Sequence, residues 1–177
     1  MDQAFYKLLS ESTAHRISRE FIRDYVFQHP EKLQYLLEIG LNKKDKIHNK
    51  ACWSLELIFE IKLDLILPFL DDFLAKIGQY KDDSAIRSIS KICMFLSKSK
   101  TIKLSENHET KIIETCLDWL IQDKKVAIKA YSMRALFHFG KKHTWINEEL
   151  KTILIQDYFK HSAAYRATAK EILKKLK

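Results

Sequence analysis

The chain has 177 residues, with 31 lysine and arginine against 23 aspartate and glutamate residues, so its formal net charge is +8. Hydrophobic residues make up 46%, which is typical of one globular domain or one short repeat array and argues against disorder. Only three glycines and two prolines are present. They are too few for the turns of a β-sandwich or barrel, or for a glycine-rich nucleotide-binding loop.

Apolar residues recur with the period of an amphipathic helix along the whole sequence. Ile89, Ile92, Cys93 and Leu96, for example, follow the i, i+3, i+4, i+7 spacing of one buried helix face. The pattern predicts an all-α fold, with helix ends accurate to about two to four residues. The predicted helices span 2–9, 14–28, 31–40, 47–61, 64–78, 84–98, 107–122, 126–139, 147–160 and 163–176.

Several residues predict where these helices begin and end. Ser105 and Thr144 are of the type that caps a helix N-terminus, and Pro68 marks either a helix start or a kink. Each glycine follows a helical run, where a backbone with positive φ commonly ends a helix. We therefore predict such C-terminal caps at Gly40, Gly78 and Gly140.

The cysteines indicate whether the chain could bind a metal, and the N-terminus indicates in which cellular compartment it would act. Cys52, Cys93 and Cys116 are widely spaced within apolar helical patterns and form no C-x-x-C pair, so we predict reduced core thiols rather than a metal site. Neither a signal peptide nor an apolar run of about 18 residues is present. We expect a cytoplasmic protein with no cofactor and no membrane partner.

Four predicted helices begin alike, with a basic residue followed by a small one. The basic residues are Lys50, Arg87, Lys129 and Arg166, and they are 37, 42 and 37 positions apart. Each interval holds a further apolar helix. A repeat of about 40 residues that contains two helices is the period of HEAT repeats.

The spacing of Asp123 before Ile128 and Lys129 strengthens this reading, and the sequence resembles HEAT-like, armadillo-type helical repeats. The resemblance covers residues 45–177 and leaves 1–44 as a degenerate cap of the same domain, residues 1–177. It implies a right-handed α-α superhelix of about four HEAT-like helix pairs with an N-terminal helical cap.

Segments 49–56 and 129–133 also resemble small bacterial HEAT-like proteins, some of which carry an adenylosuccinate lyase label. Lyases of that superfamily share a flexible loop, S-S-x-M-P-x-K-x-N, and this chain contains no such stretch. The lyase activity is therefore not predicted here.

The repeated basic residues have two interpretations. They form a structural ladder with acidic or polar groups of neighbouring repeats, or they form an exposed row that binds a phosphate-bearing ligand. We predict the ladder, and its members are Lys50, Arg87, Asp123, Lys129 and Arg166.

The excess of positive charge lies in the last third of the chain. Residues 141–177 hold nine basic and four acidic residues, and residues 121–140 hold four basic and one acidic residue. An acidic partner is one explanation, with Lys124, Lys125, Lys141 and Lys142 as its candidate binding residues. The other explanation is a set of solvated lysines at helix C-termini.

No catalytic site is predicted. Asp118 and Trp119 attract attention because bacterial alkylpurine DNA glycosylases are HEAT-like proteins with a Trp-lined basic groove and an acid, and Trp53 and Trp145 are further aromatic candidates. Trp119, however, lies between apolar residues and is predicted in the core. The chain also lacks a G-x-S-x-G nucleophile motif.

The sequence therefore predicts a non-enzymatic module that binds a protein or peptide, acidic in character, on the concave face of a HEAT-like solenoid. The alternative is a nucleic-acid-binding or DNA-base-repair protein that uses the basic C-terminal third. Lysine far outnumbers arginine, which disfavours sequence-specific DNA recognition.

Overall fold

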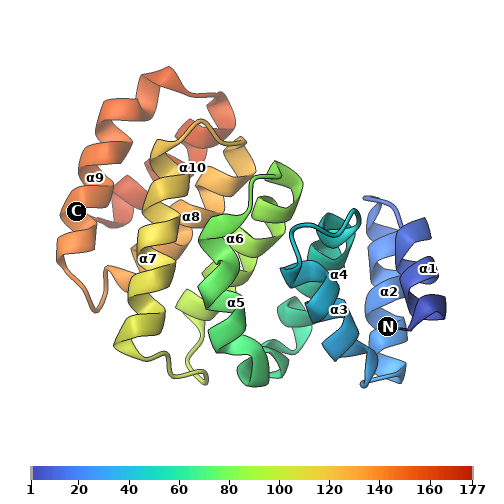
Figure 1. Cartoon of the computed structure of the whole chain (residues 1–177). Coiled ribbons are helices and arrows are strands. Elements are labelled where there is room, and N and C mark those ends of the chain that lie inside the picture. The colour runs from blue at the N-terminus through green and yellow to red at the C-terminus, as the bar shows by residue number, and fades with distance from the viewer. Residues whose placement is uncertain (1, 177) are drawn as a thin grey trace. The chain divides into compact units, whose positions relative to one another are not determined.

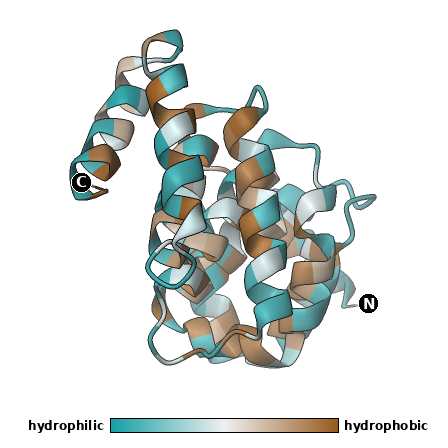
Figure 2. Ribbon diagram, turned by 90° about the vertical axis from the view of Figure 1, so that its left-hand side faces the viewer, coloured by the Kyte–Doolittle hydropathy of each residue, from teal (hydrophilic) through white to brown (hydrophobic). Residues whose placement is uncertain are grey.

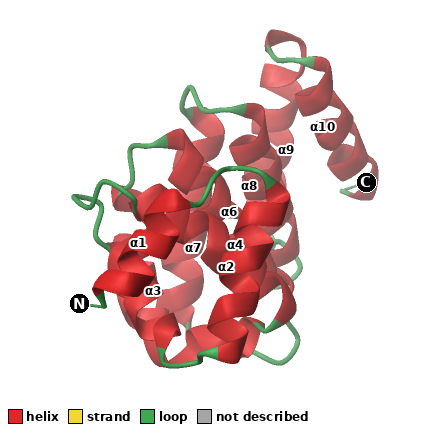
Figure 3. Ribbon diagram, turned by 90° about the vertical axis from the view of Figure 1, so that its right-hand side faces the viewer, coloured by secondary structure: helices red, strands yellow, loops and turns green. Residues whose placement is uncertain are grey.

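A computed structural model describes residues 2–176, and helices joined by turns and loops make up this part of the chain (Figures 1 and 3). The α-helices are α1 (Gln3–Glu11), α2 (Arg16–Gln28), α3 (Lys32–Leu41), α4 (His48–Ile61), α5 (Leu70–Lys76), α6 (Asp83–Lys98), α7 (Glu106–Ile121), α8 (Val126–Phe139), α9 (Trp145–Asp157) and α10 (Ala163–Lys175). Short 3-10 helices are η1 (Leu63–Phe69), η2 (Ile77–Gln79) and η3 (Tyr158–Lys160).

The chain divides into two compact units, and the boundary falls within α6. Unit 1 is Met1–Ile89 and unit 2 is Ser90–Lys177. In unit 1, α4 is the central helix because α1, α2 and α3 all pack against it. Its side chains are consequently buried around most of the helix, including Cys52, Leu55, Ile58 and Phe59. Burial of each such side chain contributes roughly 1.5–3 kcal/mol.

Unit 2 is built in the same way around α8, which packs against α7, α9 and α10. Hydrophobic and hydrophilic residues are interspersed along the helices of the chain, as Figure 2 shows by colour. The apolar side of each helix faces the shared core, where Ile112, Cys116, Leu136, Leu150 and Ile172 are buried. The period-3.6 pattern thus explains both cores.

The predicted helices are confirmed, with one clear interruption. The span predicted as one helix, 64–78, is η1 followed by α5 and η2. Pro68 lies inside η1, and α5 begins two residues later. Proline lacks an N–H and its ring clashes with the preceding turn, so it kinks or breaks an α-helix, and here the α-helix begins only after Pro68. The three cysteines are free and buried, as predicted.

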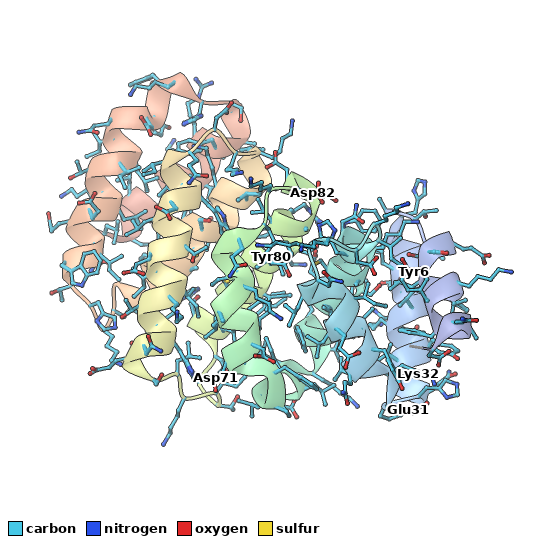
Figure 4. The ribbon with its side chains drawn as sticks, viewed as in Figure 1. Tyr6, Glu31, Lys32, Asp71, Tyr80 and Asp82 are labelled. Atoms are coloured by element: carbon cyan, nitrogen blue, oxygen red, sulfur yellow. The ribbon has the colours of Figure 1, made fainter. Side chains whose placement is uncertain are left out.

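The predicted positive-φ caps are wrong, since no glycine in the structure has positive φ. Gly40 instead lies within α3 and allows a close approach to α4. A Cβ added there would lie 2.9 Å from Leu55 Cδ1 and 3.4 Å from the Cβ of Ala51. The Gly40 carbonyl also accepts a hydrogen bond of 2.7 Å from the hydroxyl of Tyr80, which Figure 4 labels.

Gly140 follows the same principle in unit 2. Its φ is −58°, and a Cβ there would lie only 1.9 Å from Asn147 Oδ1. Asn147 Nδ2 donates to the Gly140 carbonyl at 3.0 Å, so the glycine lets this side chain sit against the end of α8. Both glycines therefore allow a close contact and do not adopt an unusual backbone conformation.

One of the two predicted N-caps is confirmed. Ser105 Oγ accepts a hydrogen bond from the His108 backbone N–H at 3.2 Å, in a reciprocal capping arrangement at the start of α7. The prediction for Thr144 is wrong, because its backbone is already helical (φ −59°, ψ −29°) and its side chain forms no cap hydrogen bond. An N-cap side chain reaches the first N–H groups only from an extended backbone.

We predict that Gly40→Val lowers the free energy of unfolding by about 1–3 kcal/mol, because the added side chain overpacks the contact between α3 and α4. Urea unfolding followed by circular dichroism measures this change. Gln34→Val, at an exposed position of the same helix, is the matched control and should stay within about 0.5 kcal/mol. Equal stability of the two variants would contradict the close approach.

Candidate basic interaction surface

Two of the predicted ladder residues are lysines that bind helix ends. Lys50, at the start of α4, donates to the Ser10 and Ser12 carbonyls at the end of α1, the latter at 2.7 Å. Lys129, near the start of α8, donates to the Leu120 carbonyl in the last turn of α7 at 2.6 Å. The last carbonyls of a helix lack partners within it and carry partial negative charge. A lysine therefore satisfies and stabilises them.

Arg87 binds a carboxylate instead of a carbonyl. Its Nη1 lies 3.3 Å from Glu56 Oε2, which also accepts a hydrogen bond of 2.7 Å from Ser88 Oγ. Glu56 belongs to α4 and is 1% exposed. The sequence analysis did not identify this carboxylate. Its position between Leu55 and Leu57 in an apolar helix could have indicated that it is buried.

The remaining ladder residues are Asp123 and Arg166. Burial lowers the pKa of Lys129, and the negative charges of Asp157 and Asp123 oppose this shift. Asp123 itself is exposed, so it acts on Lys129 through its charge. The Arg166 side chain has no hydrogen-bond or ion-pair partner within residues 2–176. The predicted positions thus differ in what they contact.

The four lysines predicted to bind an acidic partner do not form one cluster. Lys124 and Lys125 precede α8, whereas Lys141 and Lys142 follow it. A helix of this length separates the two pairs by about 20 Å. Lys142 is moreover directed to Glu109, at 2.9 Å.

Glu109 holds two basic side chains at the C-terminal end of α8. Its Oε2 lies 2.9 Å from Lys142 Nζ and 2.6 Å from His143 Nε2, and the residue is 8% exposed. Burial raises the pKa of Glu109, but the hydrogen bonds and charges of His143 and Lys142 outweigh it and lower the pKa below 4.5. Sequence reasoning did not identify this cluster.

Lys141 belongs to a different group, which we call the basic surface: Lys98, Arg134, Phe137, His138, Lys141 and Lys175. Lys141 Nζ lies 5.7 Å and Lys175 Nζ 5.8 Å from the centroid of the Phe137 ring. Glu171 contacts two members, Lys175 at 2.7 Å and Arg134 at 3.5 Å. Residues from α6, α8 and α10 and from the turn after α8 thus combine cations with one aromatic ring.

His138 reports the local charge of this surface. Burial lowers its pKa below the ordinary value of 6.5, and the positive charges of Lys141, Lys98 and Lys175 lower it further. The same lysines that disfavour a charged imidazole favour a nearby anion. The basic surface is therefore suited to a negatively charged ligand.

The three tryptophans considered for DNA repair differ in their surroundings. Trp119 is buried, as predicted, and Trp53 Nε1 donates to Ser84 Oγ at 2.8 Å in unit 1. Trp145 is 56% exposed at the start of α9.

Residues 2–176 contain no group of three or more His, Cys, Asp or Glu side chains placed to hold a metal ion. Over the same residues, none of the helices combines the length and apolarity needed to cross a bilayer.

Helices that pack in successive pairs, with basic residues at recurring helix starts, define an α-helical repeat protein. The chain belongs to the HEAT repeat domain family, whose profile matches residues 5–176. It is also similar to the crystal structure of an engineered protein, with 14% identity and a TM-score of 0.57 over 99% of this chain and 74% of the other.

These comparisons confirm the predicted all-α, HEAT-like solenoid class. No curated protein matches the chain. A HEAT repeat domain is a scaffold that fits a role in protein interaction, and no enzyme family is matched.

We predict that Glu109→Gln destabilises the protein by about 1–2 kcal/mol at neutral pH, because Lys142 and His143 lose a charged acceptor. The pKa of Glu109 is lowered in the folded state, so its stabilisation is present above about pH 4.5 and is lost as the pH falls through the folded-state pKa. The difference between wild type and variant should therefore shrink in acid, as measured by urea unfolding across pH. Glu114→Gln, exposed on the same helix, should show no such trend.

Proposed function

We propose that this HEAT-repeat protein is a non-enzymatic interaction module whose basic surface binds an acidic segment of another protein. The observation that carries the proposal is that Lys141 and Lys175 lie over the Phe137 ring, and that the charges of these two lysines and of Lys98 act on the neighbouring His138. Repeat scaffolds expose extended surfaces whose own side chains can bind a partner. The proposed binding therefore involves no cofactor. We expect the protein to act in the cytoplasm, since its three cysteines are free and buried and form no disulfide.

Charge and aromatic character together support a protein ligand. Carboxylates of an acidic segment would pair with lysine ammonium groups, and an apolar side chain would contact the half-buried Phe137 ring. Glu171 already forms ion pairs with Arg134 and Lys175. Lys98 and Lys141, in contrast, form no ion pair within residues 2–176. These two lysines are therefore available to a partner.

Nucleic acid is the second candidate, because a ring flanked by lysines also suits base stacking beside phosphates. One observation favours protein over nucleic acid, because Arg134 is the single arginine among the six residues of the basic surface. Arginine is the residue that most often reads bases.

The test is a titration with a labelled poly-glutamate peptide, in parallel with duplex DNA at low and physiological salt. The peptide should bind, and Lys141→Gln with Lys175→Gln should weaken it about tenfold, or about 1.4 kcal/mol. Peptide binding should also raise the pKa of His138, followed by NMR, because the bound negative charge offsets the three lysines.

Lys125→Gln with Lys151→Gln is the matched control, since it removes the same charge from exposed positions elsewhere in unit 2. This variant should bind nearly as well as wild type. Equal weakening by the two double variants would show that only net charge matters, which contradicts the proposal. DNA binding with a steep salt dependence, without peptide binding, would support the second candidate.

A further inference from the structure

A second surface of unit 2 is a groove of about 500 Å³ between the end of α9, η3 and α10. Its volume is within the range of ligand pockets in general, roughly 300–1,000 Å³. Most of its lining is apolar or aromatic, and the two lysines that also line it are exposed, so we call them its rim. The lining residues are Ile155, Tyr158, Phe159, Lys170, Leu173 and Lys174.

The apolar residues of the groove are unusually accessible. Phe159 is 85% exposed and Ile155 is 56% exposed. The Tyr158 and Phe159 rings are packed edge to face, with centroids 5.2 Å apart, so together they form a preformed aromatic wall. Contiguous exposed apolar groups of this kind mark interaction sites, and aromatic residues commonly supply most of the binding energy there.

The rim of the groove is positively charged. Lys170 and Lys174 are four residues apart on α10 and therefore lie on the same helix face. Neither forms an ion pair or a side-chain hydrogen bond within residues 2–176. The neighbouring acids already have partners, because Asp157 contacts Lys160 at 2.9 Å and Glu171 contacts Lys175 at 2.7 Å. Two unopposed cations therefore flank an apolar floor.

We propose that this groove docks an amphipathic, acidic helix of a partner protein. Two apolar side chains of that helix, spaced i and i+3 or i+4, would contact Phe159, Ile155 and Leu173, and carboxylates beside them would pair with Lys170 and Lys174. Charge argues against a second copy of this chain as the occupant, since each copy carries +8 and the rim is itself positive. The groove is separate from the basic surface, and the inference does not depend on it.

The probe is a helical peptide rich in glutamate, with leucine and phenylalanine on one face. A control peptide has the same composition but distributes its apolar residues around the helix. Fluorescence anisotropy should show binding of the first peptide and weaker binding of the second, because both carry the same charge and only one presents an apolar stripe.

Phe159→Ser should weaken binding of the amphipathic peptide about tenfold or more, and Lys170→Gln with Lys174→Gln should weaken it and reduce its salt dependence. Trp145→Ser is the matched control, since it removes an exposed aromatic residue from the other end of α9 and should leave the affinity unchanged. Lys141→Gln with Lys175→Gln should also retain binding, which separates this groove from the basic surface.

Four results would overturn the inference. They are absence of binding, equal binding of the two peptides, self-association that Phe159→Ser abolishes, and binding to anionic phospholipid vesicles in place of the peptide. The third result would assign the groove to a second copy, and the fourth to a membrane surface. Each leaves the poly-glutamate test of the basic surface unaffected.

Discussion

A long basic side chain at the start of a helix, bound to an earlier helix, is the interaction on which the packing depends. Lys50 holds the carbonyls that end α1, and Lys129 holds a carbonyl in the last turn of α7. Arg87 reaches the buried carboxylate of Glu56 in α4. Helix packing buries the ends of these helices, and an unpaired polar group there costs about 1–3 kcal/mol. The basic residue satisfies that group and sets the position of the two helices.

The helices outside residues 64–78 were predictable because burial of an apolar stripe follows from local spacing alone. The repeat period was predictable for the same reason, since each helix pair must bury the apolar face of the neighbouring pair. The role of Gly40 was not, because a glycine beside a helix end is compatible with either a turn or a close contact. Only the position of Leu55, 2.9 Å from where a Cβ would lie, decides between them.

The candidate surfaces were predictable only in part. The charge excess in the last third identified Lys141, but its neighbours come from α6, α8 and α10 and are distant in sequence. Adjacent lysines in sequence also proved to face different groups, since Lys142 binds Glu109 while Lys141 lies by Phe137. The groove at Phe159 was missed because exposure of an apolar residue depends on which helices cover it.

The most direct test of this account is urea unfolding of Lys50→Met, which keeps the apolar stem of the side chain but removes its ammonium group. The free energy of unfolding should fall by about 1–3 kcal/mol, since the carbonyls of Ser10 and Ser12 lose their donor. Lys46→Met, at an exposed position just before α4, should change it by less than about 0.5 kcal/mol. A Lys50→Met protein as stable as wild type would contradict the account.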